Sequence, residues 1–391
     1  MQLRNSILRE CVEVNDLKEL IAVPDCILCS VIVSLVICVL VGCAGKTKVT
    51  TDEIDNGGVA ETSSRTPLPF DSVFVKIRET NLSRAGTPPI GEVTQLSVGP
   101  NGRMLISDPA ITRGVYLFTE DGDFLRRVGK YGTNSGEYLY PAFHGFDQSG
   151  RIYIYDGDRL VLLAFDQDGH YISSFFVGKY FHKIVFDSRS APFFFTATYY
   201  DRKRQTDATV FHYTRDGQFL EKFCASPVFD GRAGYHGGGV AVDLDNAVYV
   251  ISPYEYKIRK FGKGGRLDLS FGTPPSDFRF MPTSDALAVS RNDRESWHSS
   301  WTHIWNLMFF EKGFLMLWME DFESKHGGQS STIDYFDLYN LEGKLINSKV
   351  PLPDGGSNYC AVNNYLFSLK SSKARTDSTI IDHILCVYHL R

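Results

Sequence analysis

The chain has 391 residues, of which 43% are hydrophobic and 22% charged, and this ordinary globular composition excludes wholesale disorder. Its formal net charge of −5 does not favour a nucleic-acid-binding protein. Aromatic residues make up 13% of the chain, an enrichment that favours strands. These quantities limit the possible architectures and partners, but they do not identify a ligand.

An uncharged apolar run extends from Cys26 to Val41. As a helix it would span about 24 Å, less than the roughly 30 Å hydrocarbon core of a bilayer. The run is therefore typical of a signal sequence rather than of a spanning helix. Its last two residues and the two that follow, Leu40-Val41-Gly42-Cys43, resemble the lipobox of bacterial lipoproteins. This resemblance implies that Cys43 is lipidated and becomes the first residue of the mature chain.

The residues before the apolar run are unusual for a signal sequence. Arg4, Arg9 and Lys18 are outnumbered there by five acidic residues, whereas signal sequences begin with a short positive segment. We therefore expect translation to start downstream of Met1. An uncleaved N-terminal anchor is the alternative.

Two turn types recur along the rest of the chain. The first ends in Gly102 and Gly150. The second is a D-G-type turn whose glycines are separated by 47, 48, 48 and 78 residues, at positions 122, 169, 217, 265 and 343. Short β-branched and aromatic runs lie between the turns. About 48 residues with four short strands fit one blade of a β-propeller, and the length available predicts six blades.

The predicted fold is therefore all-β: a six-bladed β-propeller with four-stranded blades. Its units are predicted at 90–141, 142–183, 184–236, 237–290, 300–353 and 354–391. The last unit lacks sequence for an outer strand, and the alternating segment 72–78 has no other place. We expect this N-terminal strand to close the last blade, with Val73, Val75 and Ile77 facing the neighbouring sheet.

The unit that begins VGPNGRMLISD and continues to a Gly-rich link ending in Pro141 is similar to NHL-type repeats. With the lipobox, the chain resembles the six-bladed β-propeller lipoproteins of Bacteroidetes-type bacteria. The resemblance implies a signal segment at 1–42, a lipid anchor and flexible tether at 43–67, and a propeller at 68–391. It also implies a lipid-anchored envelope protein on the outer membrane, facing the periplasm. It carries over no catalytic residue.

In a propeller, the links between blades and the turns between second and third strands lie on one face. The sequence places aromatic and basic residues there, together with Asp108 and Asp156. Aromatic faces and guanidinium groups suit sugars, carboxylates and peptides. The predicted ligand-binding residues are Tyr131, Tyr199, Arg204, Arg232, His236 and Trp301. A solvated rim with tyrosines packed between blades is the alternative.

Two insertions interrupt the repeat. Trp297, Trp301 and Trp305 are spaced four residues apart and would form one stripe if helical, either in the core or as a platform for glycan stacking. The insertion 320–331 lengthens blade 5, and loops often carry function.

Catalytic and metal motifs are lacking: the sequence contains neither HExxH nor GxSxG. We expect no metal, no cofactor and no disulfide among Cys224, Cys360 and Cys386. The leading hypothesis is a lipid-anchored binding or scaffold module for glycans or peptides, with the membrane as a partner through Cys43 and no nucleic acid. A metal-dependent hydrolase or lyase of NHL type and a structural subunit of an envelope complex are the alternatives.

Overall fold

The computed structural model divides the chain into two compact units, and its described residues all belong to the second, Thr51–Arg391. It describes residues 67–84, 86–196, 208–225, 237–253, 255–280, 299–324, 330–353, 356–373 and 381–391. The predicted signal segment, Cys43 and nearly all of the tether lie outside these ranges. So do four of the predicted site residues, Tyr199, Arg204, Arg232 and His236.

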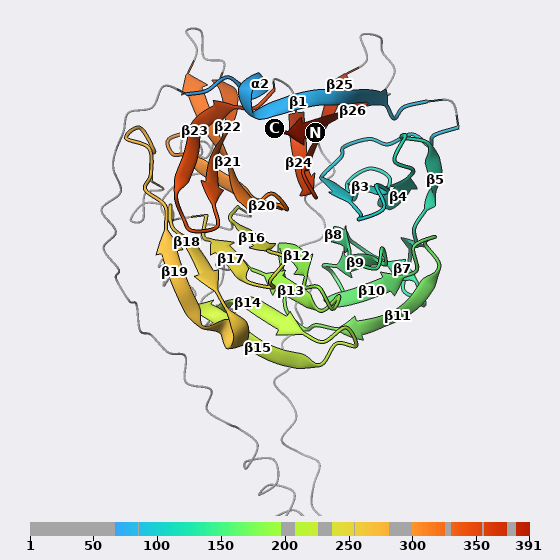
Figure 1. Cartoon of the computed structure of the whole chain (residues 1–391). Helices are drawn as coiled ribbons and strands as arrows, with labels where there is room; N and C mark the ends of the chain where they lie inside the picture. The colour runs from blue at the N-terminus through green and yellow to red at the C-terminus, as the bar shows by residue number, and fades with distance from the viewer. Residues whose placement is uncertain are drawn as a thin grey trace, which may run out of the picture. The chain divides into compact units, whose positions relative to one another are not determined.

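Six four-stranded antiparallel sheets make up the described fold (Figure 1). In each sheet the strands follow one another outwards from the centre. The innermost strand of each blade contacts those of its two neighbours, which closes a ring in the order β24, β2, β8, β12, β16 and β20. This confirms the prediction of an all-β propeller with six four-stranded blades.

The strands of the first three blades fall within one residue of the predicted units. Blade 1 contains β2 (Gln95–Val98), β3 (Met104–Asp108), β4 (Gly114–Phe118) and β5 (Phe124–Arg127). Blade 2 contains β8 (Pro141–Phe146), β9 (Ile152–Asp156), β10 (Val161–Phe165) and β11 (Tyr171–Phe176). Blade 3 contains β12 (Lys183–Phe186), β13 (Pro192–Phe195), β14 (Ala208–Tyr213) and β15 (Phe219–Ala225).

The other three blades follow the same plan. Blade 4 contains β16 (Gly239–Val242), β17 (Val248–Ile251), β18 (Ile258–Phe261) and β19 (Leu267–Phe271). Blade 5 contains β20 (His303–Phe310), β21 (Phe314–Ser324), β22 (Ser330–Asn340) and β23 (Leu345–Pro351). Blade 6 contains β24 (Gly356–Val362), β25 (Tyr365–Lys373), β26 (Ile381–Leu390) and β1 (Phe74–Asn81).

Little else is regular in the described ranges. Helical structure there is limited to α2 (Phe70–Val73) and the 3-10 turn η2 (Lys263–Gly265). In the link from blade 1 to blade 2, β6 (Lys130–Tyr131) pairs in parallel with β7 (Glu137–Tyr138).

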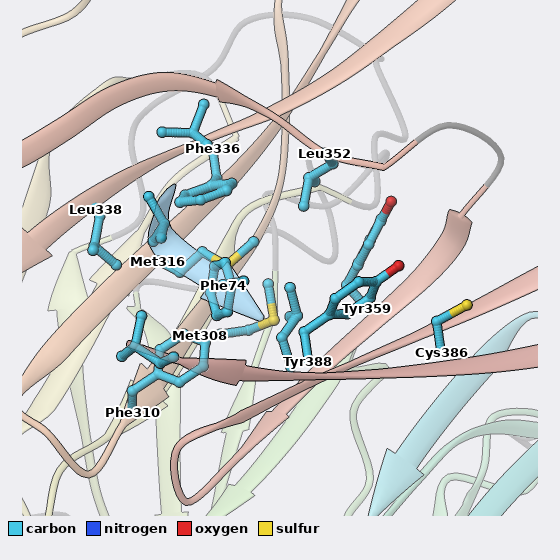
Figure 2. Packing of buried hydrophobic residues seen from close by; sticks show 14 residues of the cluster. Phe74, Met308, Phe310, Met316, Phe336, Leu338, Leu352, Tyr359, Cys386 and Tyr388 are labelled. Atoms are coloured by element: carbon cyan, nitrogen blue, oxygen red, sulfur yellow. The ribbon is translucent and has the colours of Figure 1, made fainter. Parts of the chain in front are cut away.

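The N-terminal strand closes the ring as predicted, because β1 pairs antiparallel with β26 as the outer strand of blade 6. The predicted inward face was wrong in part. Phe74 is fully buried, whereas Val75 and Ile77 are 38% and 54% exposed. Phe74 lies among Phe310, Phe336 and other apolar side chains of blades 5 and 6 (Figure 2). The side of the strand that carries the large Phe74 ring therefore faces inwards, and the side that carries Val75 and Ile77 does not.

Turn conformation explains why the repeat is clear in some blades and faint in others. The turn between first and second strands contains a residue with positive φ in all six blades, namely Gly102, Gly150, Ser190, Asn246, Gly313 and Asn363. Glycine adopts this left-handed conformation without steric cost, so a glycine there is a visible signal. Blades 3, 4 and 6 use Ser or Asn in the same conformation, and these turns escape a search for glycine.

The apolar core is divided among the seams between blades. Each of the six seams holds one cluster of buried side chains. Cys360 lies in the innermost strand of blade 6, Cys386 in its third strand and Cys224 in the outer strand of blade 3. All three are free thiols, as predicted.

Candidate functional site

The antiparallel order of the strands gives the ring two unlike faces. The turns between first and second strands, and between third and fourth strands, share one face, which we call the turn face. The turns between second and third strands share the other face with the links between blades, and we call it the link face. The turn face has short, tight turns, whereas the longer connections lie on the link face. A ligand site is therefore best sought on the link face.

Of the two predicted site residues that the structure describes, Tyr131 lies at the surface of the link face. Its side chain is 50% exposed in β6, and the Arg113 guanidinium lies over its ring at 4.8 Å from the ring centroid. Arg113 comes from the β3–β4 turn, so a link and a turn meet here as expected. Whether this pair binds a ligand stays a prediction.

Trp301 is placed differently from the expectation. Its side chain is fully buried and stacks on His303, with ring centroids 3.9 Å apart. Trp305 lies in strand β20, so Trp301 and Trp305 are not part of one helical stripe. Trp297 lies outside the described residues. The indole packs inside the protein where the chain enters blade 5, as the alternative of a core tryptophan predicts. A role of Trp301 in ligand binding stays a prediction.

Asp108 and Asp156, which the sequence places on the ligand face, have a structural role. Both are fully buried at the ends of second strands. The Asp156 carboxylate accepts hydrogen bonds from four backbone N–H groups, those of residues 139, 140, 158 and 159. The Asp108 carboxylate accepts three, from residues 91, 111 and 112. The Asp that ends the second strand of the repeat thus connects, through hydrogen bonds, the link that precedes its blade to the turn that follows the strand.

Blade 5 carries a different arrangement of acids at the link face. Glu320 and Asp334 lie directly opposite each other on β21 and β22. The Trp305 indole N–H donates to Glu320 Oε2 at 2.7 Å, and the Trp318 indole N–H donates to Asp334 Oδ1 at 2.8 Å. The Tyr359 ring from blade 6 meets Trp318 edge to face, with centroids 4.9 Å apart. We call these five residues the acid–indole cluster.

The electrostatics of the acid–indole cluster are unfavourable for two ionised carboxylates. Burial raises the pKa of Glu320 above its ordinary value, and the nearby Asp334 adds to this increase. Burial also raises the pKa of Asp334, while the Trp318 indole N–H opposes the change. Neither carboxylate has a Lys or Arg partner within the described ranges. Such acids mark candidate functional sites.

The cluster is only partly enclosed. Trp305, Trp318, Glu320 and Asp334 are half-buried, and Tyr359 is buried beneath them. β21 and β22 pair as far as Ser324 with Ser330, well beyond the start of β20, so their hairpin projects on the link face. The predicted insertion 320–331 is thus an extension of this hairpin, with residues 325–329 outside the described ranges.

Sequence reasoning flagged the insertion and Trp305 but missed the cluster. Trp318 and Glu320 are two residues apart in one strand, and Asp334 and Phe336 are two residues apart in the next. Side chains two residues apart share a face of a strand. Acids that continue the apolar, inward-facing side of a strand are the signal that could have located the site.

Two further polar groups lie on the innermost strands. Lys183 Nζ donates to the backbone oxygens of Gly238 and Trp305 and to Asn306 Oδ1, and burial lowers its pKa to about 7. His144 is almost fully buried in β8, and burial lowers its pKa to about 3, so the ring is neutral at pH 7. Both ring nitrogens of His144 are without a hydrogen-bond partner in the described part of the chain. Among the described residues, no three His, Cys, Asp or Glu side chains are grouped to hold a metal ion.

The fold and the site can now be compared with known proteins. Residues 54–277 match the model of the DUF5128 family, described as a 6-bladed beta-propeller, and this match covers more than half of the chain. The chain belongs to the DUF5128 family. A search of curated proteins found no significant match.

Solved structures support the same architecture. A protein from Bacteroides fragilis NCTC 9343, named as a candidate exported protein, is similar with a TM-score of 0.59 and 14% identity over 84% of this chain and 98% of its own. A member of the DUF4221 family from Bacteroides vulgatus has a TM-score of 0.57 and 11% identity over 81% of this chain and 98% of its own. At these identities the likeness shows the fold of this DUF5128 member alone. No helix of the described residues is long and apolar enough to cross a membrane.

Proposed function

We propose that this DUF5128 protein is a lipid-anchored binding module of the bacterial envelope that recognises its ligand on the link face. The observation that carries the proposal is the acid–indole cluster, where two half-buried carboxylates lie beside aromatic rings without a cationic partner in the described ranges. Folding alone gives no reason to keep such acids, since burying an uncompensated charge costs free energy. Sites that trade stability for recognition have this property.

The link face is also favoured over the turn face on geometric grounds. On the turn face, side chains of the turn residues are largely used by the turns themselves. Asp147 accepts from the backbone N–H of residues 149 and 151, and Asp243 accepts from those of residues 245 and 247. On the link face, Arg113 and Tyr131 form an exposed pair and the blade 5 hairpin projects.

The envelope location rests on the sequence before the propeller and on the likeness to a candidate exported protein. Cys43 is the proposed lipid attachment site, on the outer membrane facing the periplasm. Changing Cys43 to Ala should move the protein out of the detergent phase in a phase-partition experiment, and the wild-type chain should carry a diacylated N-terminal Cys43 by mass spectrometry. An unmodified Cys43 would show that the anchoring proposal is wrong.

The binding face is tested with the full chain on glycan, peptide and amine arrays. Combined substitution of Arg113 and Tyr131 by Ala, or of Glu320 by Gln and Asp334 by Asn, should remove the array signal. The exposed Asp216 lies in a turn-face turn of blade 3, and Asp216→Asn is the matched control that should leave the signal unchanged. Signal that survives both link-face changes but not the control would move the site to the turn face.

A further inference from the structure

The acid–indole cluster differs from the acid next to it in how its charge is balanced. Asp321 follows Glu320 on β21 but has two cations nearby. Arg279 lies 3.2 Å from Asp321 Oδ1 and Lys349 lies 3.8 Å from Asp321 Oδ2. Thr302 Oγ1 also donates to Asp321 at 2.6 Å. The basic residues of this region thus compensate Asp321 and leave the pair beside it without a cationic partner in the described ranges. Glu320 accepts from the Trp305 indole and interacts with the Thr332 side chain, and Asp334 accepts from the Trp318 indole.

Three aromatic rings lie beside the uncompensated pair. The Trp305 and Trp318 rings lie 6.2 Å apart at an interplanar angle of 32°, and Tyr359 closes the blade 6 side. The Tyr359 hydroxyl donates to the Pro353 carbonyl oxygen. These rings provide π surface near the acids, and the negative face of an aromatic ring attracts a cation.

A second polar group, Ser368, lies on the blade 6 side. Ser368 lies directly opposite Tyr359 in the antiparallel pair of β24 and β25, so the two side chains project from the same face of the sheet. The Ser368 side chain is fully buried, and it interacts with the Tyr359 side chain. Tyr359 and this buried hydroxyl thus form the blade 6 side of the acid–indole cluster.

We propose that the acid–indole cluster binds an alkylammonium group, either a quaternary ammonium or a protonated amine. Three aromatic rings and two carboxylates provide cation–π contact and charge compensation together. A divalent metal fits less well, because Ca²⁺ requires six to eight oxygen ligands and the cluster offers two carboxylates. This inference names the ligand class for the site under the proposed function and rests on it.

The test is titration of the full chain with choline, followed by tryptophan fluorescence and calorimetry. The matched ligand is 3,3-dimethyl-1-butanol, which has the shape of choline without its charge. Choline should bind saturably and at least about tenfold more tightly than the neutral alcohol. Equal binding of the two ligands, or no saturable binding of choline, tetramethylammonium or butylammonium, would overturn the proposal.

Variants show whether the binding occurs at this cluster. Glu320→Gln and Asp334→Asn keep the size and the acceptor for each indole, and each should weaken choline binding at least about tenfold. Trp318→Leu should weaken it more than Trp318→Phe, which keeps a ring. Asp216→Asn should have no effect. Each variant is first checked for a cooperative thermal transition, and binding that is unchanged in folded Glu320→Gln and Asp334→Asn would refute the site.

Two sources of an alkylammonium group remain to be separated, a free small amine and a lysine side chain of a peptide. Titration with a short peptide containing lysine or trimethyllysine distinguishes them, since a peptide site should bind the peptide more tightly than choline. The link-face function and the alkylammonium site can also be refuted independently of each other. Loss of array binding in the Arg113 and Tyr131 variant without any choline binding would leave the link-face function standing and remove the ammonium site.

Discussion

Blades 2 and 5 both bury acids near the link face, and they use them in opposite ways. Asp156 in blade 2 is fully buried, but four backbone N–H groups surround its carboxylate. Glu320 and Asp334 in blade 5 are more exposed, yet burial raises the pKa of both. Their side-chain donors, an indole N–H for each and Thr332 for Glu320, do not offset this effect of burial. Burial alone therefore does not distinguish these two kinds of acid. The number and kind of hydrogen-bond donors to the carboxylate distinguish them.

The largest effect is expected from removing the structural acid. Asp156→Ala would leave four N–H groups of a link and a turn without their acceptor. Hydrogen bonds to a charged group contribute about 1.5–3 kcal/mol each and are not additive, so we expect a loss of about 3 kcal/mol in the free energy of unfolding. Urea unfolding measures it. Asp158 is exposed in the same turn, and Asp158→Ala should change stability by less than about 0.5 kcal/mol. Equal losses in the two variants would contradict the structural role of Asp156.

The acids of blade 5 should respond in the opposite direction. Glu320→Gln and Asp334→Asn remove a charge that burial disfavours, and an amide oxygen still accepts the indole N–H. We expect the melting temperature to stay the same or rise in each variant, while Asp156→Asn lowers it. Differential scanning calorimetry at pH 7 provides the comparison. A clear decrease in melting temperature in both blade 5 variants would assign these acids to the fold.

The pH dependence sharpens the same contrast. A carboxyl whose pKa is raised by folding costs stability at high pH, where it is ionised, and costs nothing once protonated. The advantage of Glu320→Gln and Asp334→Asn should therefore shrink as the pH falls through the raised pKa values towards the ordinary values of 4.5 and 3.8. Thermal melts between pH 4 and pH 8 follow the change. An advantage that stays constant over this range would mean that it does not arise from ionisation.

The fold was largely predictable because turns that recur in its blades require a backbone conformation that favours glycine. Gly122, Gly169, Gly217 and Gly343 all have φ between 84° and 86°, and this conformation favours glycine strongly enough to show in one sequence. Blade closure was predictable from a missing outer strand. The face that β1 buries was not, because Phe74 and Val75 are both apolar and a bulge shifts the register between Lys76 and Arg78.

The site was less predictable for a physical reason. Tyr131 was placed on the link face correctly because topology alone decides which connections share a face. The burial of Trp301 and the pairing of Glu320 with Asp334 depend on the register of β20, β21 and β22. A bulge at Trp305, between Ile304 and Asn306, changes that register. Such a bulge depends on tertiary packing and has no marker in the sequence.

Lys183 provides the smallest and most specific test, as a buried charge of the opposite sign. Its ammonium donates to three neutral oxygens rather than to a carboxylate, and burial lowers its pKa from 10.5 to about 7. Between these two pH values the unfolded chain holds more protons than the folded chain, so stability rises with pH. Lys183→Met removes this contribution. The stability of the wild-type chain relative to Lys183→Met should therefore increase from pH 7 to pH 9, as measured by urea unfolding at each pH. A difference that is independent of pH would show that the Lys183 ammonium is solvated rather than enclosed. Lys183 would then behave as a surface lysine, and the contrast between compensated and uncompensated buried charges would not extend to it.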